Sequence, residues 1–314
     1  MTLPPDAPLL LDVPLALVAA VAALRVAGGG DGFARVVAFM AYGLVLGLVW
    51  TRLGAVDVAL TEVAVGSGIT GMVLLRAVRD APFTREREVG LLYHLCAGLM
   101  ALAVFVALAA VVVLLPDPAP TLAAEVAKAL PATDLGNPVT GVLIVFRALD
   151  TLLETVVLLL ALIGVWSLSP DPRWRGAPSV PWPAPPSGAL DFLARVVVPV
   201  GGLVGVYMFW AGADVPGGAF QGGAVLAAMA LLAIMAGLAP VPELGGRRLR
   251  LALLAGPFAF LGVGIGGWVW AGTFLDYPDG IEKPVIIAVE VAITLSIAVT
   301  LALLVLGPPA GRKA

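Results

Sequence analysis

The chain has 314 residues, of which 61% are hydrophobic and only 12% are charged. A soluble domain is about half apolar and about a quarter charged, so this composition excludes an ordinary soluble protein and indicates one embedded in lipid. The net charge of −3 gives no attraction for nucleic acid. The single cysteine, Cys96, and the single histidine, His94, exclude an internal disulfide, a thiolate metal site and bis-histidine haem ligation. We therefore expect no cofactor held by this chain alone and no enzymatic activity of its own.

Apolar stretches follow one another along the chain, and each approaches the roughly 20 residues that a membrane-spanning helix needs. The stretches are continuous and do not alternate, which favours helices over a barrel. The N-terminal segment lacks Lys and Arg, so its apolar stretch is interpreted as a retained span and not as a cleaved signal peptide. We predict an all-α, polytopic membrane protein with about nine transmembrane helices: Val13–Ala27, Phe33–Leu53, Val56–Arg76, Gly90–Leu115, Thr140–Leu168, Leu190–Ala211, Gly218–Leu238, Leu251–Gly272 and Pro284–Leu306.

The basic residues predict the orientation of these spans. Fourteen of the 18 Lys and Arg residues fall in alternate loops, and only Arg52, Lys128 and Lys283 fall in the loops of the other side, while Arg147 lies inside a span. Cytoplasmic loops carry the excess of Lys and Arg. The N-terminus is therefore expected outside and the C-terminus in the cytoplasm.

A proline-rich segment divides the chain. Ser179–Ser187, SVPWPAPPS, holds four prolines in nine residues, and proline favours an extended, non-helical backbone. We predict a linker over residues 179–188 that separates five spans from four, so that two modules are fused in one chain. The outer loop Pro116–Val139 contains TLAAEVAKAL, which predicts a short surface helix.

The fifth predicted span contains three charged residues, although charged side chains are costly in a bilayer and often mark ion or proton paths. Arg147, Asp150 and Glu154 are spaced i, i+3 and i+7, which places them on one face of a continuous helix. Arg147 can pair with Asp150, which leaves Glu154 as a candidate protonatable group. The alternative is an internal salt bridge that fixes helix packing.

Solitary titratable residues occur on three other spans. Asp57, near the outer boundary, is either a helix cap or a functional acid. Glu62 and Glu290 each lie about two turns inside a span, where they could carry protons, pair with a cation or bond to a neighbouring helix. Their similar depth to that of Glu154 suggests a shared polar seam. His94, one turn inside the cytoplasmic end of its span, is either a proton shuttle or a packing residue.

A glycine-rich turn joins the sixth and seventh predicted spans. Proline and glycine there permit a sharp turn and a close approach of two backbones, and the first N–H groups of the seventh span could face an anion or a partner carboxylate. Physical reasoning alone favours a tight helical hairpin with small residues at a helix contact. The residues that form this pattern are Asp214, Pro216, Gly217, Gly218, Gln221, Gly222 and Gly223.

These three patterns resemble motifs of the Mrp-type multisubunit cation/proton antiporters and of the related energy-converting hydrogenases. Asp57-Val-Ala-Leu-Thr-Glu62 resembles the D-[LV]-A-L-T-[EQ] motif of the small subunit that corresponds to the carboxy-terminal part of the antiporter A subunit. Phe146-Arg147-Ala-Leu-Asp150-Thr151-Leu-Leu-Glu154 is similar to the F-R-G-F-D-T-x-G-E motif of the next small subunit. Gly212–Gly223 is similar to the G-H-N-x-P-G-G-G-F-x-G-G signature of the antiporter B subunit.

The resemblance implies three small subunits fused in one chain: an A-subunit-like module over 1–80, a second small-subunit-like module over 81–178, and a B-subunit-like (MnhB-like) module over 189–314. The first two correspond to the small membrane subunits of the hydrogenase type known as D and E. The resemblance also implies a bacterial or archaeal-type cell membrane, antiporter-like partner subunits, and a path for protons or Na⁺. We expect Glu62, Arg147, Asp150, Glu154 and Glu290 to form this path, together with Asp57 and with His94 as an inner-side relay. The chain departs from the family pattern at Gly66, Val145, Ala213, Asp214 and Ala219.

Two other functions remain open on the sequence. One is an autonomous secondary transporter, against which the spans offer no interior lysine and no obvious broken helix. The other is a non-conducting scaffold whose acidic residues only stabilise helix contacts.

Overall fold

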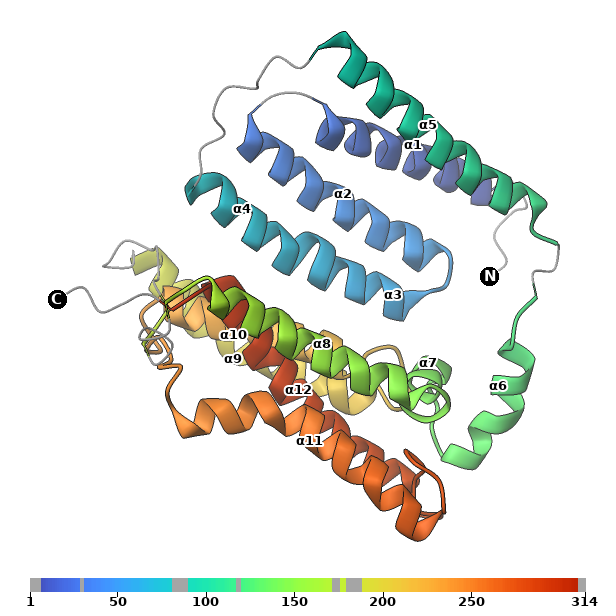
Figure 1. Cartoon of the computed structure of the whole chain (residues 1–314), viewed down its shortest axis with the longest axis vertical. Coiled ribbons are helices and arrows are strands. Elements are labelled where there is room, and N and C mark those ends of the chain that lie inside the picture. The colour runs from blue at the N-terminus through green and yellow to red at the C-terminus, as the bar shows by residue number, and fades with distance from the viewer. Residues whose placement is uncertain are drawn as a thin grey trace.

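The computed structural model describes residues 7–28, 31–80, 90–116, 120–170, 176–178 and 188–309. Within these ranges the regular elements are helices, apart from an isolated bridge between Pro178 and Pro309. Figure 1 shows two groups of helices, with α1 to α5 above and α8 to α12 below. The predicted all-α class is confirmed.

The upper group contains the first three predicted spans. They are α1 (Ala7–Ala27), α2 (Gly32–Arg52) and a helix that runs on through α3 (Val56–Thr61), the π-helical segment η1 (Glu62–Thr70) and α4 (Gly71–Asp80). The wide turns of η1 fall on the sequence EVAVGSGIT, where glycine weakens the preference for regular α-helix. The sequence did not predict this π-helical segment.

The middle of the chain contains one isolated span and one interrupted span. Its elements are α5 (Leu91–Leu114), α6 (Ala123–Ala129), the 3₁₀ segment η2 (Leu130–Thr133), α7 (Pro138–Thr140), the π-helical segment η3 (Gly141–Phe146) and α8 (Ala148–Ser167). The short helix predicted in the outer loop is therefore present as α6. The pair α6–η2 meets the pair α7–η3 at an angle of 94°.

The lower group is built around the last helix of the chain. Its elements are α9 (Gly188–Ala211), α10 (Ala219–Met235), α11 (Arg247–Trp270) and α12 (Glu282–Leu306). Helix α12 packs against α8, α10 and α11, and 67% of its apolar window is buried. Phe260 of α11 and Ile293 and Leu303 of α12 belong to this buried core.

The predicted number of spans agrees with the helices found. In the described part of the chain, eight helices are long and apolar enough to cross a membrane, or up to nine if the bent pair is counted as one span. These eight correspond to eight of the predicted spans. The remaining prediction, Gly218–Leu238, corresponds to α10, an apolar helix of only 17 residues.

The fifth span is not the continuous helix that the sequence predicted. Arg147 has a non-helical backbone (φ −129°, ψ 36°) between η3 and α8, so the prediction of one continuous helix through Arg147 was wrong, while Asp150 and Glu154 lie one turn apart on α8. The expectation that no span is visibly broken was also wrong. The physical reason is a change of helical winding, since η3 closes its last bond from the Arg147 N–H to the Val142 oxygen, five residues back.

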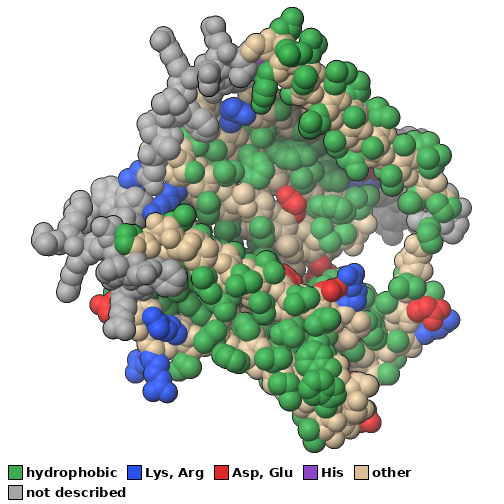
Figure 2. Space-filling view, in the orientation of Figure 1, with side chains coloured by type: hydrophobic (Ala, Val, Ile, Leu, Met, Phe, Trp, Pro, Cys, Tyr) green, Lys and Arg blue, Asp and Glu red, His purple; other side chains and the backbone are tan. Residues whose placement is uncertain are grey.

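Helix α5 presents an apolar surface that the rest of this chain does not cover. None of its residues is buried, and Figure 1 shows it at the upper edge of the molecule. Figure 2 shows hydrophobic side chains over this helix and most of the face, with a few acidic and basic side chains near the hollow between the two groups. Such a surface requires lipid or other membrane helices around it.

Two predictions concern residues that the structure does not describe. The proline-rich linker falls on residues 179–187, and Arg85, Arg87, Arg173, Arg175, Arg312 and Lys313 also lie outside the described ranges. The orientation of the termini therefore stays a prediction. The ends of the third and ninth predicted spans meet, because Arg76 Nη1 donates to the Val305 oxygen at 2.8 Å and also to the Leu306 oxygen. Strict alternation of the spans predicts that these two ends lie on the same side of the membrane.

We predict that Arg76→Ala destabilises the chain by about 1–2 kcal/mol, because a cation at a helix C-terminus binds carbonyl groups that have no helical partner. The measurement is the thermal unfolding midpoint of the purified chain in detergent. Lys128→Ala on the exposed face of α6 is the control, since among the described residues Lys128 forms its ion pair with Glu125 at the surface. Equal midpoints for Arg76→Ala and Lys128→Ala would show that the contact contributes nothing.

Candidate functional site

The first turn of α3 holds a buried carboxylate that bonds to the glycine-rich turn, 160 residues further along the chain. Asp57 is 8% exposed, and its Oδ1 accepts a hydrogen bond from the Gly217 N–H at 2.9 Å. The N-cap of α3 is Ala55, which makes no side-chain cap, so of the two alternatives for Asp57 the helix cap was wrong. The sequence left open whether a partner carboxylate faces the glycine-rich turn, and the structure places Asp57 there.

Asn137 joins this contact to the middle of the chain. Its Nδ2 donates to the backbone oxygens of Gly212 and Val215, each at 3.1 Å, and approaches Asp57 Oδ1 at 3.4 Å. An amide nitrogen has two hydrogens, so the longest contact is the weakest. The Asn137 Oδ1 accepts from the Val139 N–H at 2.9 Å and caps α7. We call Asp57, Asn137 and the Gly212–Gly218 turn the three-way junction.

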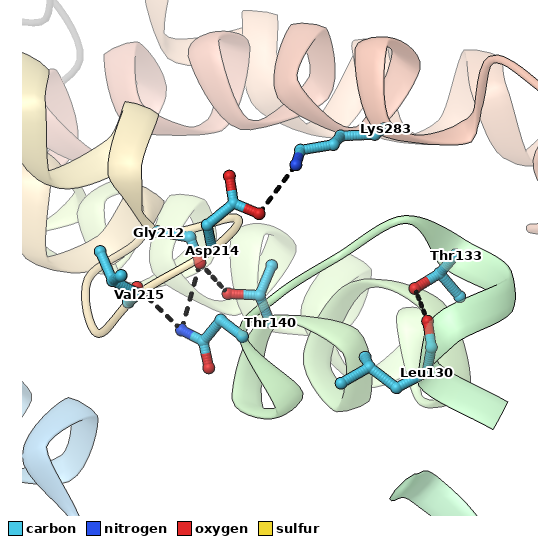
Figure 3. A network of polar contacts seen from close by, with 8 residues as sticks. Leu130, Thr133, Thr140, Gly212, Asp214, Val215 and Lys283 are labelled. Atoms are coloured by element: carbon cyan, nitrogen blue, oxygen red, sulfur yellow. Dashed lines mark hydrogen bonds and ion pairs between the residues drawn. The ribbon is translucent and has the colours of Figure 1, made fainter. Parts of the chain in front are cut away.

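Backbone and hydroxyl groups tighten the junction. Thr140 Oγ1 donates to the Gly212 oxygen at 2.6 Å, a contact that Figure 3 shows beside Val215 and Asp214. The Gly136 and Asn137 N–H groups both donate to the Ala213 oxygen at 3.0 Å. The Gly212 and Ala213 carbonyl groups of this turn are therefore satisfied by residues 136–140, as buried groups require.

Glycine is required in the turn because its backbone approaches itself closely. A Cβ on Gly212 would lie 2.5 Å from the Gly218 nitrogen, and one on Gly217, whose φ is +153°, would lie 2.5 Å from the Met208 oxygen. Pro216 is exposed beside them.

The helix that follows the turn uses small residues for close contacts. A Cβ on Gly222 would lie 2.7 Å from the Gly205 oxygen of α9, and a Cβ on Gly223 would lie 2.8 Å from the Ile297 side chain of α12. The predicted small-residue helix contact is therefore present together with the carboxylate contact.

Asp214 and Ala213, two positions that depart from the family pattern, have different environments. Ala213 is fully buried. Asp214 is exposed and forms an ion pair with Lys283 Nζ at 2.7 Å, as Figure 3 shows. The ion pair holds the turn against the start of α12.

A cavity of about 270 Å³ lies beside the junction. It is lined by α3, α7, η3, α8, the start of α10 and α12, and thus by all parts of the chain that the sequence divided into modules. Glu154 and Glu290 both line it, so two of the three acids expected to form a polar seam share one cavity. The other polar side chains of its lining are Thr61, Thr140, Thr151, Thr155 and Gln221.

Glu290 is the most deeply buried acid of this cavity. Glu290 is 1% exposed, and its Oε2 has no hydrogen-bond partner among the described residues. Glu154 is exposed. An ionised carboxylate without a partner is costly away from water, so Glu290 requires a proton, water or a cation from the cavity.

The break before α8 frees two carbonyl groups that side chains then satisfy. Thr151 Oγ1 donates to the Leu143 oxygen at 2.5 Å, and the Tyr277 hydroxyl donates to the Ile144 oxygen at 3.1 Å. Burial, with the nearby charge of Glu290, raises the pKa of Tyr277, so its hydroxyl stays protonated and keeps donating. The carbonyl groups that the break exposes are therefore hydrogen-bonded, and the break forms part of one wall of the cavity.

Arg147 and Asp150 form the ion pair that the sequence predicted, at the break itself. Their side chains are 71% and 51% exposed, and neither residue lines the cavity. The pair therefore lies at the edge of the site, where it fixes the start of α8.

Glu62 and His94 do not line the cavity, although Thr61 does. The Glu62 carboxylate lies over Gly66, one turn further along the helix. A Cβ at position 66 would lie 2.5 Å from Glu62 Oε1, so glycine at this position leaves room for the carboxylate. His94 is exposed on α5, with Nδ1 3.3 Å from the Gly90 oxygen.

Sequence reasoning missed Asn137, Thr140, Tyr277 and a pairing role for Lys283. Asn137 had a usable signal, because an Asn-Pro pair before an apolar run is typical of a helix N-terminus. Lys283 was counted only as an outer basic residue. Thr140 and Tyr277 carried no local signal, since each bonds to a carbonyl group far away in sequence. In the described part of the chain, no group of three or more His, Cys, Asp or Glu is placed to hold a metal ion.

Comparisons with known proteins support the sequence motifs. A family model described as a domain related to the MnhB subunit of Na⁺/H⁺ antiporter matches residues 189–308, and the MbhD family model, which describes the D subunit of MBH, matches residues 15–83. No curated protein matches the chain.

Two solved structures share the fold. The Mrp complex from Dietzia sp. DQ12-45-1b aligns with 96% of this chain at a TM-score of 0.75 and 23% identity, and the chain spans only 35% of the matched chain. The membrane-bound sulfane sulfur reductase (MBS), an archaeal respiratory membrane complex, aligns with 68% of this chain and 97% of its own at a TM-score of 0.56 and 23% identity.

We predict that Thr140→Val lowers the stability of the chain by about 1 kcal/mol, because it removes a buried hydrogen bond between two distant segments. Thr133→Val is the matched control. Thr133 is also buried, but its hydroxyl bonds only to the Leu130 oxygen of its own turn, at 2.7 Å. The measurement is the difference between the two thermal unfolding midpoints, and a larger loss for Thr133→Val would contradict the junction.

Proposed function

We propose that this chain, which belongs to the Mrp-type antiporter subunits through an MbhD-like and an MnhB-like segment, contributes a proton or sodium path to a larger ion-translocating complex. It is a multi-pass protein of a prokaryotic cell membrane, and its families are transport families and not catalytic ones. The observation that carries the proposal is the cavity that Glu154 and Glu290 share.

The proposed path uses acids that have no structural partner. Glu290 has a buried carboxylate oxygen without a hydrogen bond among the described residues, and Glu154 forms none of the ion pairs found there. Such groups are costly in membrane-spanning helices, and they commonly mark ion or proton paths. Glu62 extends the path toward α2, because a Cβ on Gly43 of α2 would lie 3.5 Å from Glu62 Oε1 and because Glu62 directly follows Thr61 of the cavity wall.

The remaining charged residues have positioning roles in this proposal. Asp57 holds the glycine-rich turn, and the Arg147–Asp150 pair fixes the break before α8. His94 lies on the uncovered helix α5 and is left outside the path.

The proposed partners are antiporter-like membrane subunits that cover α5 and the hollow between the two helix groups. The large uncovered apolar surface supports partners, and the chain spans only 35% of the Mrp chain that it matches. The proposed modules are residues 1–80, 81–178 and 189–314, joined before the third by the linker 179–188.

We predict that Glu154→Gln and Glu290→Gln each reduce ion-coupled proton flux by the intact complex at least tenfold, because the amide cannot release a proton or carry a charge. Glu62→Gln is expected to act in the same direction. The measurement is proton flux in inverted membrane vesicles, and Glu125→Gln on the exposed helix α6 is the control.

Assembly of each variant is checked by mass spectrometry of the subunits that co-purify with a tagged chain. Normal assembly with unchanged flux in all three variants would favour the non-conducting scaffold. Ion-coupled flux by the chain alone in vesicles would favour the autonomous transporter.

A further inference from the structure

A second groove lies at the opposite end of the third span from the three-way junction. It is formed by the start of α2, by α4 and by the end of α12, and its volume is about 430 Å³. Figure 1 places α4 in the upper helix group and α12 in the lower one, so the groove lies where the two groups meet. Apart from Arg76 and Arg79, the described residues that line it are apolar.

The sequence of α4 places an apolar strip and two positive charges on one side of the helix. Met72, Leu75 and Val78 follow one another at intervals of three residues, and Arg76 and Arg79 are the direct neighbours of the last two. Residues three apart on a helix lie side by side, so the guanidinium groups run along the edge of the apolar strip.

The end of α12 fixes the position of one of these charges. Arg76 Nη1 donates to the Val305 oxygen at 2.8 Å and also to the Leu306 oxygen. Gly307, whose φ is +77°, leaves room for the guanidinium, because a Cβ there would lie 2.7 Å from Arg76 Nη1. The guanidinium is therefore already ordered, and a ligand that binds it loses little additional side-chain freedom.

A groove at the other end of α2 has the same size but a different charge. It lies between α1 and α2, and its volume is also about 430 Å³. Its charged residues are Arg52 and Asp12, which form an ion pair at 2.9 Å. None of the described residues that line the groove of Arg76 and Arg79 is acidic. Of these two apolar grooves, the lining of the second one therefore carries a positive charge.

The depth of the groove and the chemistry of its lining restrict the occupant. The span Val56–Arg79 ends at the second arginine, and long basic side chains at the end of a span reach the lipid headgroups. A free anion would leave the apolar strip uncovered. An acyl chain covers the strip, and a phosphate group binds arginine through charge-assisted hydrogen bonds. Basic pockets between membrane helices bind anionic headgroups in this way.

We infer that the groove binds one anionic phospholipid, with its phosphate at Arg76 and Arg79 and an acyl chain along Phe33, Met72 and Val78. Phe33 and Arg79 are exposed, so the lipid can enter from the membrane. It joins α2 and α4 of the MbhD-like segment to α12 of the MnhB-like segment. This lipid site is independent of the proposed ion path.

The test is native mass spectrometry of the delipidated full chain in a neutral detergent. Phosphatidylglycerol and phosphatidylcholine with the same acyl chains are added at equal concentrations. Each arginine near the membrane surface favours an anionic lipid by about fivefold. We expect the wild-type chain to retain one phosphatidylglycerol, with a preference over phosphatidylcholine of about fivefold or more.

Two variants test the two parts of the groove separately. Arg79→Gln is expected to lower the preference for phosphatidylglycerol about fivefold, and Val78→Trp is expected to reduce retention of the lipid by filling the apolar strip while both arginines stay in place. Arg52→Gln is the matched control, because Arg52 also ends a span and lines an apolar groove of the same volume. It should keep the wild-type preference.

Equal retention of the two lipids by the wild-type chain, or an unchanged preference in Arg79→Gln, would overturn the inference. If inorganic phosphate raises the thermal unfolding midpoint as much as phosphatidylglycerol does, the groove takes a free anion and not a lipid. The intact complex, purified from native membranes, tests for a different occupant. If the wild-type complex carries no more anionic phospholipid than the Arg79→Gln complex, a partner subunit covers the groove and the inference is wrong.

Discussion

The Asp57 carboxylate and the Gly217 N–H, which lie 160 residues apart in the chain, meet at 2.9 Å in the protein interior. A buried carboxylate must find donors, because its desolvation is costly otherwise. The turn supplies one donor, and Asn137 reaches both partners from the middle of the chain. The ends of α3, α7 and α10 are therefore fixed together, and the geometry of the cavity beside them depends on this junction.

The cavity follows from the junction because its walls begin at the same three points. Thr61 lies one turn beyond Asp57 on α3, Thr140 follows Asn137 on α7, and Gln221 follows the turn on α10. Glu154 and Glu290 then enter from α8 and α12. A fusion of small subunits into one chain would hold the three parts of the site at a high effective concentration relative to one another, which favours their assembly.

The sequence predicted the membrane class and the positions of the spans well, because continuous apolar runs reflect the solvent directly. The sequence also identified Glu154 and Glu290 as acidic residues inside apolar spans. The sequence did not predict the break at Arg147, because the residues around Arg147 favour a regular helix. The break is stabilised by Thr151 and by the distant Tyr277. The role of Asp57 was missed for the same reason, because its partner Gly217 lies in another part of the chain.

Electron cryo-microscopy of the assembled complex, at a resolution that shows side chains, tests the central claim most directly. The account predicts that Asp57 Oδ1 lies within hydrogen-bonding distance of the Gly217 nitrogen, with Glu154 and Glu290 on one common cavity. A complex in which Asp57 bonds elsewhere and a partner subunit separates Glu154 from Glu290 would contradict it.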